Sequence, residues 1–127
     1  MTFANTDFTI LLIDDEPDIL EFLSYTLKKE GLKVFTANNG KDGVEMAKSL
    51  SPDLIILDVM MPQMDGYEVM QKIRQDPQFL SLPIIALTAK AMKGDREKCI
   101  EAGASDYISK PIDNEQLLSL LRVWLYM

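Results

Sequence analysis

The sequence predicts an α/β fold, namely a doubly wound, five-stranded parallel sheet built from five strand–helix repeats. Short apolar runs alternate five times with longer segments whose apolar residues recur at helical spacing. The runs are apolar throughout, a pattern typical of parallel strands that are covered on both faces. Strands and helices in this alternation, joined by right-handed crossovers, place helices on both sides of one sheet.

Each apolar run defines an expected strand, and each is bounded by polar or turn-forming residues. The five strands are expected at residues 9–13, 33–37, 54–57, 83–87 and 106–109. The second run is the weakest of the five because polar residues interrupt it. In a parallel sheet all carboxyl ends lie at one edge, so the residues that follow the runs are brought together.

The segments between the expected strands carry apolar residues at helical spacing, and each such apolar stripe predicts an amphipathic helix. The first stripe ends at Gly31 and the fourth at Gly103, and glycine is suited to closing a helix. Asp113 is placed to cap the last helix. The fourth stripe, at residues 92–102, is thin and contains Gly94, so we expect a loosely held helix there.

Length and charge restrict the class of protein. The 127 residues suit one domain, which we expect to span residues 1–127 with residues 1–7 as a flexible N-terminal tail. The net charge of −7 disfavours direct binding to nucleic acid or to a membrane surface. It favours a cation or a basic partner instead.

The missing residue types restrict the chemistry. The chain has no histidine, which excludes histidine-dependent triads, imidazole metal sites and phosphohistidine carriers. Its single cysteine, Cys99, cannot form a disulfide within the chain, which fits a reducing compartment. No signal peptide or apolar span is apparent, so we expect the protein in the cytoplasm.

Polar residues at four strand ends are predicted to share one pocket. Asp14 and Asp15 follow the first strand, Asp58 the third, Thr88 the fourth and Lys110 the fifth. Three neighbouring carboxylates repel one another, and a hard cation such as Mg²⁺ relieves that repulsion. One carboxylate can then attack phosphorus, while a lysine and a hydroxyl meet the phosphoryl oxygens.

Each of these residues also has a simpler explanation. Asp14 and Asp15 precede Pro17 and could cap a helix, and Asp58 could be a turn residue. Thr88 could also be a cap, and Lys110 an ordinary solvated lysine. Their joint placement at one sheet edge favours the chemical interpretation.

Four segments resemble the receiver domains of two-component response regulators. They read ILLIDDEPDI, DLIILDVMMPQMDGYEV, PIIALTA and DYISKP, in the order and spacing of that family. The resemblance covers residues 8–126, and its second half is most similar to receivers of hybrid kinases. It implies the flavodoxin-like strand order 2-1-3-4-5 and a signalling switch, not an enzyme acting on a separate substrate.

The resemblance assigns the acceptor and the metal ligands. Asp58 matches the aspartate that is phosphorylated. Asp15 matches a direct Mg²⁺ ligand, and Asp14 matches an acid that holds the metal through water. Asp58 itself and the main-chain carbonyl of Met60 complete the protein ligands. Mn²⁺ is expected to substitute for Mg²⁺.

The resemblance also assigns the phosphoryl-binding and switch residues. Lys110 matches the lysine that pairs with the phosphoryl oxygens, and the bond before Pro111 is cis in the family. Thr88 matches the switch hydroxyl, and Ala89 the small neighbour that donates its backbone N–H. Tyr107 matches the aromatic that turns inward with Thr88, although such a residue is also an ordinary strand aromatic.

Partners follow from the resemblance and from the last helix. The phosphoryl donor is expected to be a histidine kinase or a phosphotransfer protein, because this chain has no histidine. From Glu115 onward, polar residues form only a narrow stripe with Ser119 and Arg122. The apolar remainder either forms a partner or weak dimer surface on an otherwise monomeric chain, or lies unusually deep in the core.

Three other classes of protein remain in competition. An aspartate-nucleophile phosphohydrolase would carry an acid two residues after its nucleophile, where this chain has Met60. A phosphate-independent pseudo-receiver usually lacks part of the acid set, which is complete here. A flavodoxin-like cofactor binder would need a phosphate-cradling loop after the first strand, where Asp14 and Asp15 have the wrong charge.

Overall fold

The computed structural model describes residues 7–89 and 95–126, and the expected tail lies almost wholly outside them. Five parallel strands form one sheet in the order β2-β1-β3-β4-β5, which confirms the predicted topology. The elements are β1 (Thr9–Ile13), α1 (Pro17–Lys29), β2 (Lys33–Ala37), α2 (Gly40–Leu50), β3 (Leu54–Asp58), α3 (Gly66–Arg74), the short 3₁₀ helix η1 (Pro77–Phe79), β4 (Ile84–Thr88), α4 (Asp95–Ala102), β5 (Asp106–Ser109) and α5 (Asn114–Leu125).

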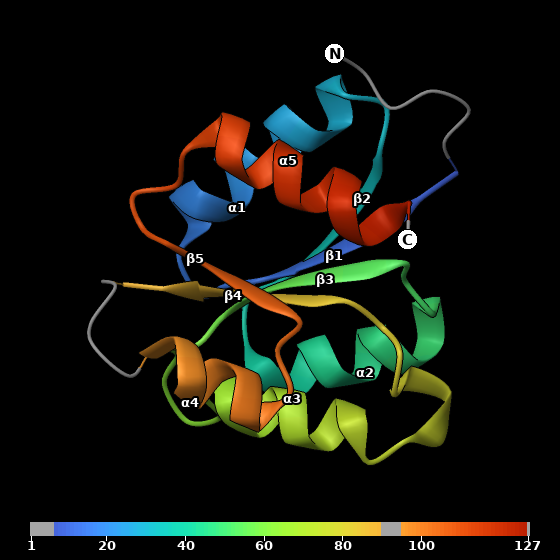
Figure 1. The fold of residues 1–127 in the computed structure, drawn as a ribbon, viewed down its shortest axis with the longest axis vertical. Helices are drawn as coiled ribbons and strands as arrows, with labels where there is room; N and C mark the ends of the chain where they lie inside the picture. Colours follow the sequence, from blue (N-terminus) through green and yellow to red (C-terminus); the bar gives the residue numbers. More distant parts are fainter. Residues whose placement is uncertain (1–6, 90–94, 127) are drawn as a thin grey trace.

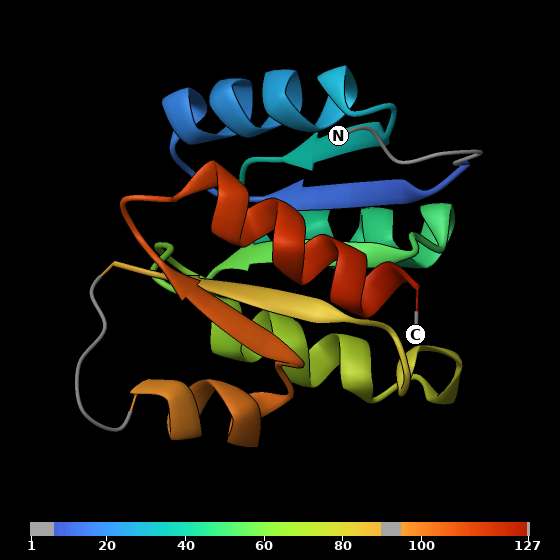
Figure 2. The ribbon, with the colours of Figure 1, turned by 45° about the horizontal axis from the view of Figure 1, so that its top comes forward.

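The sheet lies between two helical layers. Helices α1 and α5 cover one face, and α2, α3 and α4 cover the other (Figure 1). Figure 2 shows that the strands run in the same direction, with their carboxyl ends at one edge. Strand order reverses between β1 and β3, and this is where doubly wound folds bind their ligands.

The central strands are buried on both faces, as their uninterrupted apolar runs predict. In β1, Leu11 and Ile13 pack toward α2 and α3, whereas Ile10 and Leu12 pack toward α1 and α5. Strands β3 and β4 alternate in the same way and are buried along their whole length. Strand β2 is an edge strand with mostly exposed or partly exposed residues, which accounts for its weak apolar pattern.

The predicted helix ends are confirmed where the structure describes them. Gly31 has φ 93° and Gly103 has φ 123°, in the left-handed region that favours glycine. Asp113 accepts hydrogen bonds from the backbone N–H groups of two residues in the first turn of α5. Helix α4 is described from Asp95, so the first part of the predicted segment, including Gly94, lies outside the described residues.

Strand boundaries differ from the prediction by one residue at two places. β3 extends through Asp58, and β4 runs from Ile84 to Thr88 rather than from 83 to 87. The backbone N–H of Val59 still donates to Leu87, and that of Lys110 to Thr88, so the ladder continues through these strand ends. The bond between Lys110 and Pro111 is cis, as expected from the resemblance.

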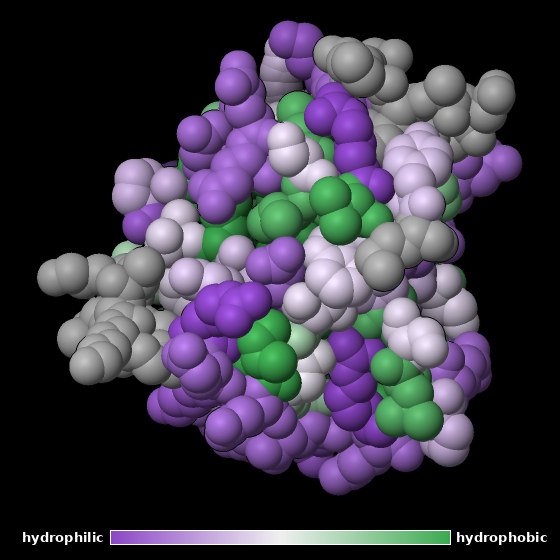
Figure 3. Space-filling model, viewed as in Figure 1, coloured by the Kyte–Doolittle hydropathy of each residue, from purple (hydrophilic) through white to green (hydrophobic). Residues whose placement is uncertain are grey.

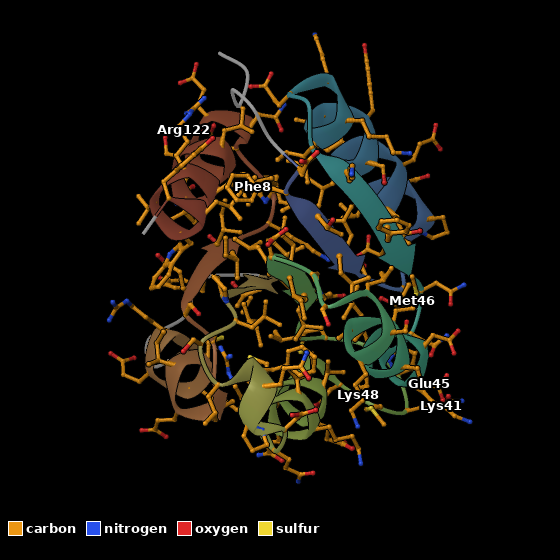
Figure 4. The ribbon with its side chains drawn as sticks, turned by 90° about the vertical axis from the view of Figure 1, so that its right-hand side faces the viewer. Phe8, Lys41, Glu45, Met46, Lys48 and Arg122 are labelled. Atoms are coloured by element: carbon orange, nitrogen blue, oxygen red, sulfur yellow. The ribbon has the colours of Figure 1, made fainter. Side chains whose placement is uncertain are left out.

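Helix α5 packs most of its apolar residues against one side of the core, some buried and others partly buried. Leu117 and Leu121 are fully buried, and much of the remaining apolar surface packs against the same core. Phe8 points toward this helix, and its ring meets Tyr126 edge-on at 5.4 Å between ring centroids (Figure 4). Figure 3 shows the apolar surface over α5 interrupted by polar side chains. These contacts favour the deep-core interpretation for most of the helix, although Val123 remains exposed.

None of the helices in the described part of the chain combines the length and apolar character needed to cross a bilayer.

Candidate functional site

Four strand ends deliver the predicted polar residues to one edge of the sheet. Asp14 directly follows β1, Asp58 and Thr88 end β3 and β4, and Lys110 directly follows β5. The parallel register pairs Asp58 with Leu87 and Thr88 with Ser109, so the ends of β3, β4 and β5 are level. Asp14, Asp58 and Thr88 are the buried polar residues of the described chain, which sets this edge apart from ordinary surface.

Three carboxylates form the acidic part of the site. Oxygen atoms of Asp14, Glu16 and Asp58 all lie within 4.8 Å of one another. The sequence interpretation missed Glu16, although this acid directly follows the aspartate pair. Asp15 is partly buried and is not among these three, but its charge is near enough to raise the pKa of Asp58.

Lys110 is the cation that these acids share. Its Nζ lies 2.9 Å from Glu16 Oε1, 3.2 Å from Asp14 Oδ2 and 3.6 Å from Asp58 Oδ2. Burial alone would lower the pKa of Lys110, but the hydrogen bond to Glu16 and the charges of both aspartates hold the pKa above its ordinary value. The raised pKa keeps Lys110 positively charged at neutral pH.

Burial makes both aspartates reluctant to ionise. It raises the pKa of Asp58 to about 6, and the charge of Asp14 adds to the effect. A hydrogen bond from the backbone N–H of Met60 and the charge of Lys110 oppose this shift without cancelling it. Burial likewise raises the pKa of Asp14, against a hydrogen bond from the backbone N–H of Glu16 and the charge of Lys110.

Two buried oxygen atoms at the site lack a hydrogen-bond partner. Asp14 Oδ2 has its ion pair with Lys110 Nζ at 3.2 Å but no well-aligned hydrogen bond, and the hydroxyl of Thr88 has no hydrogen-bond partner. Buried polar atoms normally find a partner, so unpaired ones point to a missing group. A hard cation suits the carboxylate oxygen, and an incoming anion suits the hydroxyl. The residues present therefore fit a divalent cation beside an anion.

The other predicted site residues lie on or just after the strands that end here. The backbone N–H of Met60 donates to Asp58 Oδ1 at 3.1 Å, and the Met60 side chain is 66% exposed. Ala89 is exposed at the end of β4, and Tyr107 on β5 is partly buried against the core.

A glycine packs directly against the acceptor strand. A Cβ atom on Gly66 would lie 2.5 Å from the carbonyl oxygen of Asp58 and 2.5 Å from the Cα of Val59, both backbone atoms. The backbone N–H of Gly66 also donates to Val59. The start of α3 is thereby held against the turn that follows Asp58.

Gly66→Ala is expected to lower the free energy of unfolding by about 2 kcal/mol, because backbone atoms cannot give way as a flexible side chain can. Urea unfolding followed by circular dichroism checks this. Ser49→Ala, at an exposed position late in α2, is the control. Equal stability of the two variants would show that the start of α3 tolerates a side chain.

Fold and site together define a class of protein: a small α/β domain that gathers acids and one lysine where parallel strands end. The family model for the response regulator receiver domain matches residues 10–122. The chain belongs to that family. It is a receiver domain of two-component systems, a signalling switch of the kind that binds Mg²⁺ in an acidic site and is phosphorylated by histidine kinases or phosphotransfer proteins.

Named relatives agree with this assignment. The alkaline phosphatase synthesis regulator PhoP of Bacillus subtilis is 42% identical over 89% of this chain, which spans 48% of that regulator. The receiver domain of a sensor histidine kinase from Pseudomonas aeruginosa, solved with magnesium in its active-site cleft, is 34% identical with a TM-score of 0.88, covering 96% of this chain and 100% of that one. Chemotaxis protein CheY4 of Vibrio cholerae is 32% identical with a TM-score of 0.89, covering 94% and 100%.

Proposed function

We propose that this receiver domain accepts a phosphoryl group on Asp58. A carboxylate oxygen of Asp58 attacks the phosphorus of a partner's phosphohistidine and forms the new O–P bond. The P–N bond breaks, and the ring, already protonated on its other nitrogen, leaves as neutral imidazole. The observation that carries this proposal is the burial of Asp58 between a second carboxylate and Lys110, beside the unpaired hydroxyl of Thr88.

The acids on the β1–α1 turn are the proposed metal side of the site. Asp14, Asp15, Asp58 and the main-chain carbonyl of Met60 are the proposed ligands of Mg²⁺, with Mn²⁺ as a substitute. The bound cation supplies charge neutralisation for the acids and for the phosphoryl oxygens. The burial of Asp14 and the clustering of its carboxylate with those of Glu16 and Asp58 support a cation on this side.

Lys110, Thr88 and Ala89 are the proposed phosphoryl-binding groups. Lys110 is already held 3.6 Å from Asp58, and the Thr88 hydroxyl is free to donate. Tyr107 is the proposed second switch residue, and its position on β5 between the core and the surface supports that role. Turning of Thr88 and Tyr107 would change the surface formed by α4, β5 and α5.

The phosphoryl donor, the compartment and the oligomeric state are part of the same proposal. The donor is a histidine kinase or phosphotransfer protein in the cytoplasm, and the chain itself does not turn over an external substrate. We propose a monomer or a weak dimer through α5, where the side chain of Val123 is exposed. A mass that stays monomeric over a wide concentration range would remove the dimer.

Intact-mass measurement with acetyl phosphate tests the acceptor. Wild type with Mg²⁺ should gain one labile phosphoryl group, and Asp58→Asn should gain none. Omitting Mg²⁺ should also abolish the adduct. Asp53→Asn is the matched control, because Asp53 lies at the opposite edge of the sheet, beside the backbone N–H of Thr9, and should be phosphorylated as wild type. An adduct that survives in Asp58→Asn would place the acceptor elsewhere.

Magnesium affinity is expected to fall as pH drops through the pKa of Asp58. The folded pKa is about 6, so below it the carboxyl holds a proton that Mg²⁺ must displace. Isothermal titration calorimetry should therefore show that wild type binds Mg²⁺ about tenfold more weakly near pH 5 than above pH 7. Asp58→Asn should bind more weakly with a flatter profile. A pH-independent affinity in wild type would show that Asp58 is not a ligand.

A further inference from the structure

The shortest contact of Lys110 is to a residue that none of the proposed roles uses. Lys110 Nζ donates to Glu16 Oε1 at 2.9 Å, whereas Asp58 Oδ2 is 3.6 Å away. The Lys110 side chain is 15% exposed and that of Glu16 57% exposed. Lys110, the proposed phosphoryl-binding lysine, is thus paired more closely with the exposed acid Glu16 than with the acceptor Asp58.

We propose that Glu16 is a positioning residue that competes with the phosphoryl group for Lys110. This inference rests on the proposed function, since it concerns phosphoryl binding at Asp58. In the resting state Glu16 holds the lysine toward the β1–α1 turn. Phosphoryl binding requires Lys110 to leave Glu16, so this carboxylate lowers the affinity of the site for a phosphoryl group.

The backbone around Glu16 allows its side chain to be displaced cheaply. Its N–H donates to Asp14 Oδ1 at 2.9 Å, so the main chain is fixed by a contact that does not involve the Glu16 carboxylate. Glu16 is the N-cap residue of α1, yet its side chain makes no capping hydrogen bond. Release of Lys110 therefore costs the helix nothing, and the exposed carboxylate can return to water.

The size of the effect follows from exposure. Ion pairs with one solvent-exposed partner are weak, and removing Glu16 should tighten phosphoryl-analogue binding about two- to fivefold. Screening by salt should reduce the difference further. A large effect is not expected, because Lys110 keeps its contacts to Asp14 and Asp58 in either case.

The test compares Glu16→Gln with Glu21→Gln in the full chain. Glu21 is an exposed acid one turn further along α1, so its variant removes the same charge without touching Lys110. The dissociation constant of beryllium fluoride at saturating Mg²⁺ is measured by ¹⁹F NMR, and Mg²⁺ affinity is measured separately. Glu16→Gln should bind the fluoride about two- to fivefold more tightly than wild type, and Glu21→Gln should match wild type.

A double-mutant cycle identifies the route of the effect. In a Lys110→Ala background, where fluoride binding is weaker, Glu16→Gln should change nothing further, because the competition acts only through the lysine. With acetyl phosphate, Glu16→Gln should lower the KM for phosphorylation of Asp58. A general structural role for Glu16 would not produce this dependence on Lys110.

Three results would overturn the inference. Weaker fluoride and Mg²⁺ binding by Glu16→Gln would make Glu16 a supporter of the cation, in keeping with its place among the three clustered acids. Equal affinity of Glu16→Gln and Glu21→Gln for beryllium fluoride would show that Glu16 does not hold Lys110 away from the phosphoryl site. Failure of wild type itself to bind the fluoride with Mg²⁺ would remove the proposed function and this inference together, an outcome distinct from the first two.

Discussion

Arg74→Ala is expected to lower the free energy of unfolding by about 3 kcal/mol, the largest loss anticipated for a residue outside the apolar core. Arg74 ends α3, and its guanidinium donates to backbone carbonyls of two separate segments. Nε and Nη2 reach Gly103 at 3.0 and 2.7 Å, and Nη1 reaches Phe79 at 2.6 Å and Leu82 at 2.7 Å. Alanine would leave these partly buried carbonyls without a donor.

The magnitude follows from the number and type of these contacts. Hydrogen bonds from a charged donor contribute about 1.5–3 kcal/mol each, but bonds that share one side chain do not add fully. Burial lowers the pKa of Arg74, which records the cost of placing this cation away from water. We therefore take a total close to the contribution of one or two such bonds.

The contacts also bear on the site. Gly103 lies at the end of α4 before β5, and Leu82 lies just before β4. These are the strands that end near Lys110 and at Thr88. Arg74 thus connects the segments that lead into β4 and β5, the two strands that carry the phosphoryl-binding groups. Its loss should therefore also slow phosphorylation of Asp58.

Urea unfolding of Arg74→Ala beside Lys72→Ala provides the measurement. Lys72 lies two residues earlier on α3 and is exposed, so its variant removes a positive charge without removing these carbonyl contacts. Arg74→Lys should recover only part of the loss, since one ammonium cannot reach carbonyls on both segments. A loss no greater than that of Lys72→Ala would show that water replaces the guanidinium.

The sheet could be predicted because its signal is local. Uninterrupted apolar runs identified the buried strands, and Gly31 and Gly103 marked helix ends through a backbone conformation that other residues rarely adopt. The placement of Asp14, Asp58, Thr88 and Lys110 at one edge then followed from parallel strand direction alone. None of these inferences required knowledge of a distant contact.

The contacts that escaped prediction depend on side-chain reach. Glu16 meets Lys110 across 94 positions of sequence, and Arg74 meets Gly103 across 29. Glu16 and Arg74 have long side chains and lie at helix ends. A charged residue at such a position is expected only to be exposed to solvent, so the sequence does not reveal its distant partner. The depth of α5 was undecided for a similar reason, since an apolar helix surface has the same pattern against a core or a partner.

Asp58→Asn is expected to stabilise the metal-free protein by about 3 kcal/mol near pH 7.5. Burial raises the pKa of the Asp58 carboxyl from 3.8 to about 6, so the folded state binds its proton more tightly than the unfolded state does. This favours folding below pH 3.8 and is lost as pH rises through about 6. Above that range wild type buries an unfavourable charge that asparagine does not carry.

Urea unfolding in the presence of a chelator, at several pH values, measures this difference. The advantage of Asp58→Asn should be full above about pH 7 and should vanish near pH 4. Asp18→Asn, at an exposed position in the first turn of α1, is the control and should show no comparable dependence on pH. An asparagine variant that is less stable than wild type at neutral pH would mean that Lys110 outweighs burial.

Magnesium should reverse the ranking of the two proteins. A ligand that binds only the folded state adds stability in proportion to the logarithm of its concentration over its dissociation constant. Wild type keeps the three proposed acidic ligands Asp14, Asp15 and Asp58, so Mg²⁺ should raise its free energy of unfolding. Asp58→Asn lacks one of these ligands and should gain little. The same burial that destabilises the metal-free acidic site therefore favours cation binding at Asp58, because a cation offsets the negative charge that the fold has buried.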